Sequence, residues 1–161
     1  MKKTLLALFI VLALPISAFC AGTVVETIIY DHKDDFGHAV KIQYAITGDA
    51  SAGTVPDHTI ALFTVDDTNS SKSVYLQNFF LYDVETIPGA GGDAPDAYTV
   101  DVKDSDGFSL CDISARSTSA KEDFPAYQTI GKFPQITEDW TLSTGAVGNS
   151  NTTTIILHFL K

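Results

Sequence analysis

The sequence predicts an all-β fold, a single antiparallel β-sandwich or a partly closed barrel, and two observations lead to this prediction. Most of the chain after residue 21 consists of short runs rich in β-branched and aromatic residues, several of which alternate apolar and polar side chains. Clusters of Gly, Asp, Asn, Ser and Pro separate nearly every pair of runs, as the turns of a β-sheet protein require. Almost no segment indicates a helix.

The expected strands follow one another along the chain. They cover residues 23–31, 38–47, 58–65, 72–86, 98–103, 107–113, 139–144 and 152–160. The run at 72–86 is long, and we expect a bend or bulge near Asn78. Residues 115–133 are the least regular and are expected to form a long loop or an edge segment. No repeat or linker divides the strands, so residues 21–161 are predicted to form one β-sandwich domain.

Period-two alternation beside the turns also predicts which side chains form much of the core. These are Val100, Val102, Phe108, Leu110, Trp140, Leu142, Ile155 and Leu157. Aromatic residues at 79, 80 and 82 are interpreted as core and sheet surface rather than as a platform for sugar rings. His58 and His158, each alone in a strand-like run, are interpreted as packed or surface histidines rather than metal ligands.

Residues 1–20, MKKTLLALFIVLALPISAFC, have the order of a bacterial signal peptide. Two lysines precede an apolar core over residues 4–14 that is too short to span a bilayer as a helix. Cleavage after Cys20 is expected, because the residues one and three positions before the cut are small. Acylation of Cys20 is the alternative, which the bulky Phe19 disfavours. The sequence thus predicts an exported protein, periplasmic or extracellular, with no transmembrane segment in the mature chain.

The chain is strongly acidic, and removing the two lysines of residues 1–20 takes its formal charge from −10 to −12. Such a surface repels phosphate backbones, so no nucleic-acid partner is expected. It suits solubility, cation binding or a basic protein partner. Cys111 is the one cysteine after residue 20, which leaves no pair for an internal disulfide; we interpret it as a buried, inert thiol.

The glycine cluster PGAGGDAP, residues 88–95, does not match a phosphate-binding loop. A P-loop ends in Gly-Lys-Ser/Thr, whereas Asp93, Ala94 and Pro95 follow the last glycine here. Asp93 would repel a phosphate, and no helix follows to offer its positive end. The cluster does not match the dinucleotide-binding fingerprint either, because that motif also requires a helix after the glycines. We therefore predict an exposed loop between two strands.

The acidic run ending at Gly107 does not match an EF-hand calcium loop. With Gly107 at position six, the first and twelfth positions are Val102 and Ile113, which are apolar. Asp104 to Gly107 is instead predicted to form a hairpin turn, because Asp-Gly tolerates the positive φ angles of such turns. A looser calcium site that uses Asp101, Asp104 and Asp106 remains as the alternative.

Other polar clusters do not indicate catalysis. The segment DHKDDFGH, residues 31–38, groups His32, Asp34, Asp35 and His38, but its spacing matches no zinc pattern and favours a solvated turn. The acidic doublets at 66–67, 122–123 and 138–139 would point to opposite faces of a strand, whereas glycoside hydrolysis needs two carboxyl groups facing one bond. No nucleophile elbow or His-Glu-x-x-His motif occurs. We expect no catalytic residues, no cofactor and no metal.

The order of the motifs resembles small all-β proteins of tailed-phage and prophage structural modules, a virion-associated family. The matching stretches are ITGDASAGT (46–54), LYDVETIPGAGGDAPDAYTVDVKDSDG (81–107), ARSTS (115–119) and the final TLSTGAVGNSNTTTIILHFL (141–160). The middle stretch is the most specific. The resemblance implies a virion-associated or head–tail protein without known catalytic residues. Residues 1–20 depart from that pattern, because tailed-phage virion proteins assemble in the cytoplasm.

Two functions are therefore expected from the sequence. The first is a non-enzymatic structural or interaction protein whose partners are proteins, either phage virion components or further copies of the chain. The second is a secreted ligand-binding β-sandwich module for glycans or calcium. The signal peptide allows a secreted bacterial relative of the phage proteins or a phage-encoded envelope protein.

Overall fold

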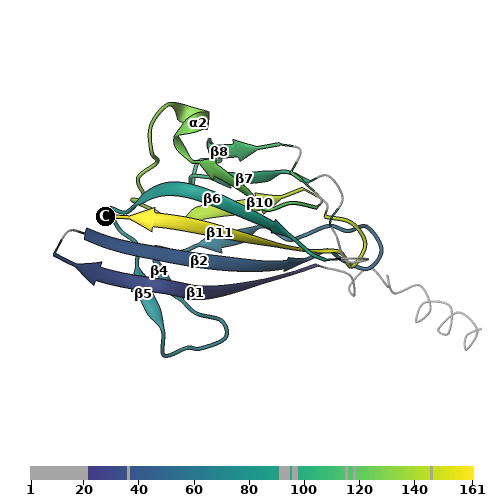
Figure 1. Ribbon diagram of the computed structural model, residues 1–161, viewed down its shortest axis with the longest axis horizontal. Helices are drawn as coiled ribbons and strands as arrows, with labels where there is room; N and C mark the ends of the chain where they lie inside the picture. The colour runs from purple at the N-terminus through teal and green to yellow at the C-terminus, as the bar shows by residue number, and fades with distance from the viewer. Residues whose placement is uncertain are drawn as a thin grey trace, which may run out of the picture.

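Antiparallel sheets pack together in the computed structural model, with a short two-stranded ribbon beside them (Figure 1). Residues 22–35, 37–90, 95, 98–114, 116–117, 119–145 and 147–161 are described. The sheets are not closed into a barrel. The predicted all-β fold is thus confirmed in its sandwich form. The predicted signal peptide, residues 1–20, lies outside the described residues.

The larger sheet has five strands in the order β1-β2-β11-β6-β9. They are β1 (Thr23–Asp34), β2 (Gly37–Thr47), β11 (Thr152–Leu160), β6 (Phe80–Pro88) and β9 (Glu122–Pro125). In β2, Val40, Ile42, Tyr44 and Ile46 are buried, whereas the residues between them are only partly covered. This period of two turns one face toward the core and the other outward. The last strand of the chain, β11, lies in the middle of the sheet (Figure 1).

The smaller sheet has four strands in the order β3-β10-β7-β8. They are β3 (His58–Ile60), β10 (Trp140–Thr144), β7 (Val100–Lys103) and β8 (Ser109–Ile113). A separate ribbon consists of β4 (Phe63–Val65) and β5 (Ser73–Tyr75), and one helical turn, α2 (Tyr127–Ile130), lies next to β8. Every strand pair in the three sheets is antiparallel.

Two expected strands are each divided in the structure. The run at 58–65 forms β3 and β4 rather than one strand. The run at 72–86 forms β5 and β6, and Asn78 between them adopts a positive φ of 67°. The break expected near Asn78 is therefore found, and it is larger than a bulge. Residues 115–133 contain the edge strand β9 together with α2, in agreement with the edge segment expected there.

Six of the eight expected core residues are buried: Val100, Val102, Trp140, Leu142, Ile155 and Leu157. The prediction for Phe108 is wrong, because 61% of this residue is exposed. Leu110 is only partly buried against the core. A bulge in the β7–β8 pair causes the difference. Val102 pairs with Cys111 and Lys103 with Ser109, so the alternation slips by one residue and Cys111 and Ile113 face inward.

The turn predicted at Asp104 to Gly107 is found between β7 and β8, with Gly107 rather than Asp106 at a positive φ. Gly107 has a φ of 83°, and its amide donates to the Asp104 carbonyl at 3.1 Å. The Asp104 carboxylate accepts the amides of Asp106 at 3.1 Å and Phe108 at 2.7 Å. Of the glycine cluster at 88–95, the structure describes residues 88–90 and 95; the rest of the predicted loop lies outside the described residues.

Side chains cap the outer edge of β1 along its first half. Glu26 and Ile28 donate their amides to Asp67 Oδ2 at 2.7 Å and Asp66 Oδ2 at 2.9 Å. These carboxylates replace the missing neighbouring strand, a common protection of sheet edges. From Ile29 to Asp34 every residue of β1 is exposed. The first half of this edge is therefore protected, and the second half lies open to solvent.

Cys111 is buried, and its burial raises the pKa of the thiol to about 12. A thiol with so high a pKa carries little thiolate at neutral pH and is chemically inert. Among the described residues, no helix has the length and apolar character needed to cross a membrane.

Candidate interaction surface

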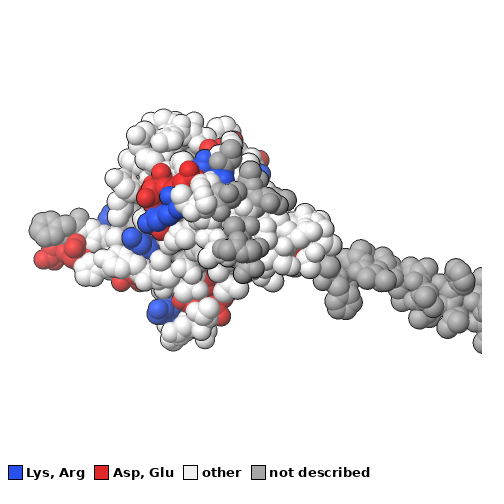
Figure 2. Space-filling view, turned by 45° about the vertical axis from the view of Figure 1, so that its right-hand side comes forward, with Lys and Arg blue, Asp and Glu red and all other residues white. Residues whose placement is uncertain are grey.

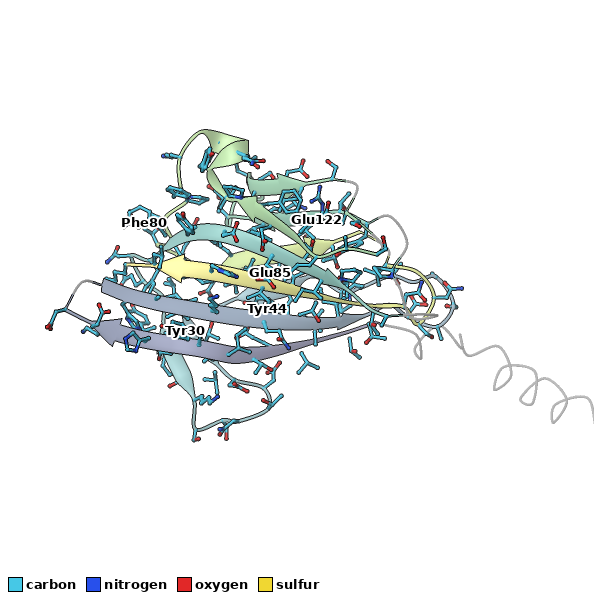
Figure 3. The ribbon with its side chains drawn as sticks, viewed as in Figure 1. Tyr30, Tyr44, Phe80, Glu85 and Glu122 are labelled. Atoms are coloured by element: carbon cyan, nitrogen blue, oxygen red, sulfur yellow. The ribbon has the colours of Figure 1, made fainter. Side chains whose placement is uncertain are left out.

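A row of side chains crosses the outer face of the five-stranded sheet at one end. The strand registers align His32 on β1 with Ala39 on β2, Ala39 with Leu160 on β11, and Leu160 with Phe80 on β6. Their sequence neighbours Val40, Phe159 and Leu81 are buried in the core, so this row faces outward. Leu160 is 41% and Phe80 42% exposed. In Figure 3, Phe80 and Tyr30 mark this end of the sheet.

Aromatic rings continue the row beyond β6. Tyr82 stacks on Phe133 with ring centroids 5.0 Å apart, and Tyr127 meets Phe133 edge-on at 5.3 Å. Tyr82 is 49% and Tyr127 45% exposed. Leu81 pairs with Phe159 and Asp83 with His158, so Tyr82 is the extra residue of a bulge in β6. We call His32, Ala39, Leu160, Phe80, Tyr82, Tyr127 and Phe133 together the outer stripe.

A hollow of about 320 Å³ lies at the β1 end of the outer stripe. Its lining residues are Tyr30, His32, Asp34, Gly37, His38, Ala39, Leu160 and Lys161. His38 Nε2 lies 2.5 Å from Asp31 Oδ1, and the His38 ring packs against Phe79 at 4.8 Å. Lys161 and His38 exchange two backbone hydrogen bonds of 2.9 Å, which anchor the chain's last residue beside the hollow.

An ionic group lies next to the outer stripe on the same sheet face. Glu85 pairs with Lys121 at 3.0 Å and with His158 at 3.4 Å. The hydrogen bond to Glu85 raises the pKa of Lys121, whereas burial and then Lys41 lower the pKa of His158. Figure 2 shows acidic and basic side chains gathered together, with uncharged surface around them. The charges of Lys121 and Glu85 thus compensate one another beside the outer stripe.

A second polar group lies inside the sandwich. His58 Nε2 on β3 is 2.9 Å from Glu26 Oε2 on β1, and the His58 ring packs against Tyr44 at 5.2 Å. Glu26 and Tyr44 are buried, and burial followed by the Glu26 charge raises the pKa of Tyr44. Because the group bridges the two sheets and only His58 among the three is partly exposed, we assign it a structural role.

The polar clusters noted in the sequence are engaged in local structure. Asp101 accepts a hydrogen bond from Ser109 Oγ at 2.5 Å and pairs with Lys103 at 3.3 Å, while Asp104 caps its own turn. In the DHKDDFGH segment, His38 pairs with Asp31, whereas His32 lies 3.8 Å from Asp34. Within the described part of the chain, no three His, Cys, Asp or Glu side chains are grouped so that they could hold a metal ion.

The acidic doublets also have structural partners rather than facing one another across a site. Asp66 and Asp67 cap β1, and Asp139 accepts the Leu62 amide at 2.7 Å. Glu122 accepts the Ser117 amide at 2.7 Å. His158 contacts Glu85 on the sheet surface, and His58 is packed inside the sandwich.

Sequence reasoning placed Phe79, Phe80 and Tyr82 in the core and on the sheet surface, which is where they lie: Phe79 is buried and the other two are exposed. It did not identify the outer stripe as one surface. Leu160 and Phe80 are 80 residues apart in the chain and become neighbours only through the β11–β6 register. One signal of this surface was available in the sequence. If Phe159 is buried, alternation along the strand places the apolar residue Leu160 on the outer face.

No protein-family model matches the chain, and no curated protein matches it either.

Proposed function

We propose that this chain is a non-enzymatic structural or interaction protein that binds a protein partner through the outer stripe. The supporting observation is the exposure of Leu160, Phe80 and Tyr82 at one end of one sheet face, with exposed Tyr127 of α2 joined to them through Phe133. Contiguous apolar surface of this kind marks binding sites on soluble proteins, and tyrosines are enriched among the residues that contribute most to binding.

The resemblance to proteins of tailed-phage and prophage structural modules supports a partner from that class, a virion component. The formal charge of −10 argues against nucleic acid as the partner. The paired charges around Glu85, next to the apolar stripe, suit the polar rim of a protein interface.

Binding to the outer stripe is tested with the proteins encoded beside this gene, each produced together with this chain. We expect one of them to bind the native chain and Phe80→Asp to weaken that binding by about tenfold or more, because it places a charge in the centre of the interface. Phe63→Asp is the matched control, since Phe63 is 58% exposed on the separate β4–β5 ribbon. Equal binding by both variants would contradict the proposal.

A second candidate function is glycan binding, favoured by the exposed rings of Tyr82 and Tyr127 around Phe133. Sugar rings stack on such faces. Binding of the native chain to immobilised oligosaccharides, lost in Tyr127→Ala, would support this second function. If, in addition, no neighbouring gene product binds the chain, glycan binding would replace protein binding as the proposed function.

We further propose that the protein is exported and that residues 1–20 are removed. Expressed in a bacterial host, the exported chain is expected to begin at Ala21, because the segment before it has the order of a signal peptide. Intact mass of the exported fraction measures this directly. A mass that includes residues 1–20, or one that includes a lipid on Cys20, would contradict the proposed cut.

A further inference from the structure

We propose that the open half of β1, residues 29–34, pairs with the same segment of a second copy of this chain in antiparallel orientation, with His32 on the two-fold axis. This inference goes beyond the proposed function, because it concerns the edge of the larger sheet rather than its outer face. Three observations support it: the direction of the backbone amides, the order of the charges and the space beside the strand.

The direction of the amides follows from the structure of β1. Glu26 and Ile28 direct their amides away from β2, since they donate to Asp67 and Asp66. The register of β1 shifts by one residue at Ile29, where Ile28 pairs with Ile42 and Tyr30 with Lys41. After this bulge the odd-numbered residues, Asp31 and Lys33, therefore direct their amides and carbonyls away from β2. These groups form the open edge.

The charges on this edge are self-complementary. With His32 on the axis, Asp31 lies opposite Lys33 of the second copy, and Lys33 lies opposite its Asp31. Opposite charges on directly paired residues stabilise antiparallel strands, and this register supplies two such pairs. The same register makes them the hydrogen-bonded pairs, because residues 31 and 33 direct their backbone groups outward. Both side chains are exposed.

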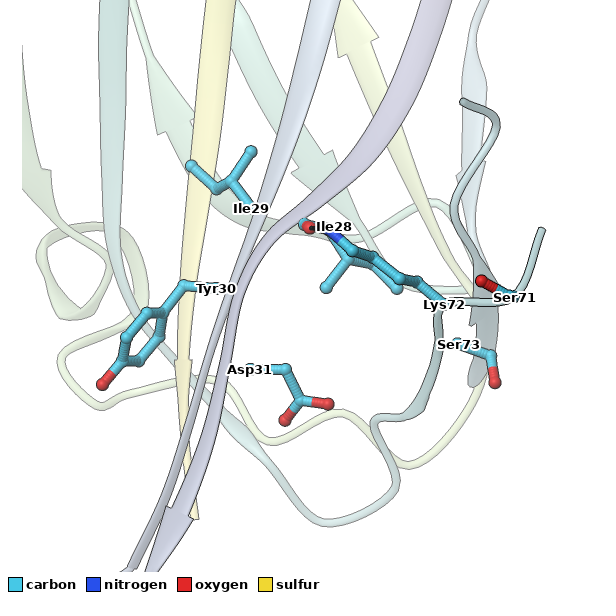
Figure 4. Close-up of a pocket in the computed structure, with 7 residues that line it drawn as sticks. All are labelled: Ile28, Ile29, Tyr30, Asp31, Ser71, Lys72 and Ser73. Atoms are coloured by element: carbon cyan, nitrogen blue, oxygen red, sulfur yellow. Dashed lines mark hydrogen bonds between the residues drawn. The ribbon is translucent and has the colours of Figure 1, made fainter. Parts of the chain in front are cut away.

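A hollow lies beside part of the open half of β1, where one end of the second strand would pass. The hollow has a volume of about 420 Å³ and lies between the middle of β1 and the segment around β5. The residues that line it, drawn in Figure 4, are Ile28, Ile29, Tyr30, Asp31, Ser71, Lys72 and Ser73. In the proposed register, Asp35 of the second copy comes opposite Ile29. Lys72, whose Nζ lies 3.4 Å from the Ile28 carbonyl, is then beside that carboxylate. One further pair of opposite charges, Lys72 with Asp35 of the other copy, thus flanks the paired strands on each side.

Pairing of this kind is closed, because the same surface is used by both copies and no open edge remains between them. It joins the two five-stranded sheets side by side. The outer stripes of both copies then lie on one continuous sheet face, since His32 belongs both to the stripe and to the axis. The dimer would offer a partner two copies of the surface proposed above.

Disulfide cross-linking tests the register. At His32 the two copies form a non-hydrogen-bonded pair, with Cβ atoms about 4.5–5.5 Å apart, near the spacing a disulfide spans. In a Cys20→Ser background, in which Cys111 is the other thiol and is buried, His32→Cys is expected to form a linked dimer under mild oxidation. Tyr30→Cys is the matched control on the same strand. Tyr30 lies opposite Asp34 of the second copy, so the two cysteines of Tyr30→Cys would not face one another. This variant should therefore cross-link at least about tenfold more slowly than His32→Cys.

Charge reversal tests the contacts. Sedimentation equilibrium of the native chain is expected to show a reversible dimer. Lys33→Asp should raise its Kd about tenfold, because it places carboxylates opposite one another twice. Adding Asp31→Lys to that variant restores opposite charges and should restore the dimer. Lys132→Asp, a reversal at an exposed site away from β1, should leave the Kd unchanged.

Any of three results would overturn the proposal. These are a native chain that stays monomeric at its highest soluble concentration, cross-linking as fast at residue 30 as at residue 32, and a double charge swap that stays monomeric while its fold is intact by circular dichroism. None of these results bears on binding through the outer stripe, which Phe80→Asp tests separately.

Discussion

Gly53→Ala is expected to lower the free energy of unfolding by about 3 kcal/mol or more, because two separate costs combine. Gly53 has a φ of 65°, which residues with a Cβ adopt only with strain. A Cβ at this position would also lie 2.5 Å from the carbonyl carbon of Gly148 and 2.6 Å from its Cα. These are backbone atoms, so no side chain can rotate away, and one of the two loops must move.

The loops that meet here join distant parts of the chain. Val147 donates its amide to the Gly53 carbonyl at 3.0 Å, and Gly48 donates to the Asn151 carbonyl at 2.9 Å. A displacement at Gly53 would strain these hydrogen bonds as well. The loop after β2 is thereby fastened to the loop before β11, at the end of the larger sheet opposite the outer stripe (Figure 1).

Gly107→Ala is the matched control for this prediction. Gly107 also has a positive φ, 83°, but no atom lies within 4 Å of a Cβ built on it. Its substitution should cost only the backbone strain, about 1 kcal/mol. Urea denaturation of the native chain and both variants measures the difference. Equal losses in the two variants would show that close packing at Gly53 contributes nothing.

Acid is expected to lower the stability of the protein from about pH 5 downward, and Asp49 should account for part of this loss. The Asp49 carboxylate is buried and accepts the amides of Ser51 at 2.7 Å, Ala52 at 2.6 Å and Thr54 at 3.1 Å. Hydroxyl donors from Ser51 and Thr54 complete the set. These hydrogen bonds hold the pKa of Asp49 well below its ordinary value, and the one from the Thr54 hydroxyl has the largest effect.

The sign of the effect follows from this lowered pKa. A carboxyl group whose pKa is lower in the folded state adds stability above its unfolded pKa, about 3.9 for aspartate, and loses it as the pH falls toward the folded value. Asp66 acts in the same direction, because hydrogen bonds from Thr68, Ile28 and Asn69 lower its pKa too. Stability should therefore be full at neutral pH and decline from about pH 5 downward.

Asp49→Asn separates this contribution from the others. The amide cannot accept five hydrogen bonds and adds two donors of its own, so the variant should be less stable at pH 7. The difference between native and variant should shrink as the pH falls toward 3, because the Asp49 carboxyl of the unfolded native chain takes up a proton near its ordinary pKa of about 3.9 while the folded carboxylate stays ionised. Asp57→Asn, at an exposed residue, is the control. A difference that stays constant from pH 7 to pH 3 would contradict the role assigned to Asp49.

The sequence by itself determined the fold class and most strand positions. The alternation in residues 38–47 and 152–160 and the Asp-Gly turn at Gly107 are local signals, and the structure confirms them. It also identified six of the eight named core residues, since a period of two fixes which side chains share a face. Phe108 was misplaced because a single bulge reverses that alternation and leaves no local mark in the sequence.

The tertiary structure alone decided which residues meet across the chain. Asp49 and Gly53 look like ordinary turn residues in the sequence, yet they form a buried junction with a loop about 95 residues later. The outer stripe joins residues from four strands that are adjacent only through the order β1-β2-β11-β6. The physical reason is that alternation and turn chemistry act over a few residues, whereas strand order and register depend on how the two sheets bury their apolar faces together.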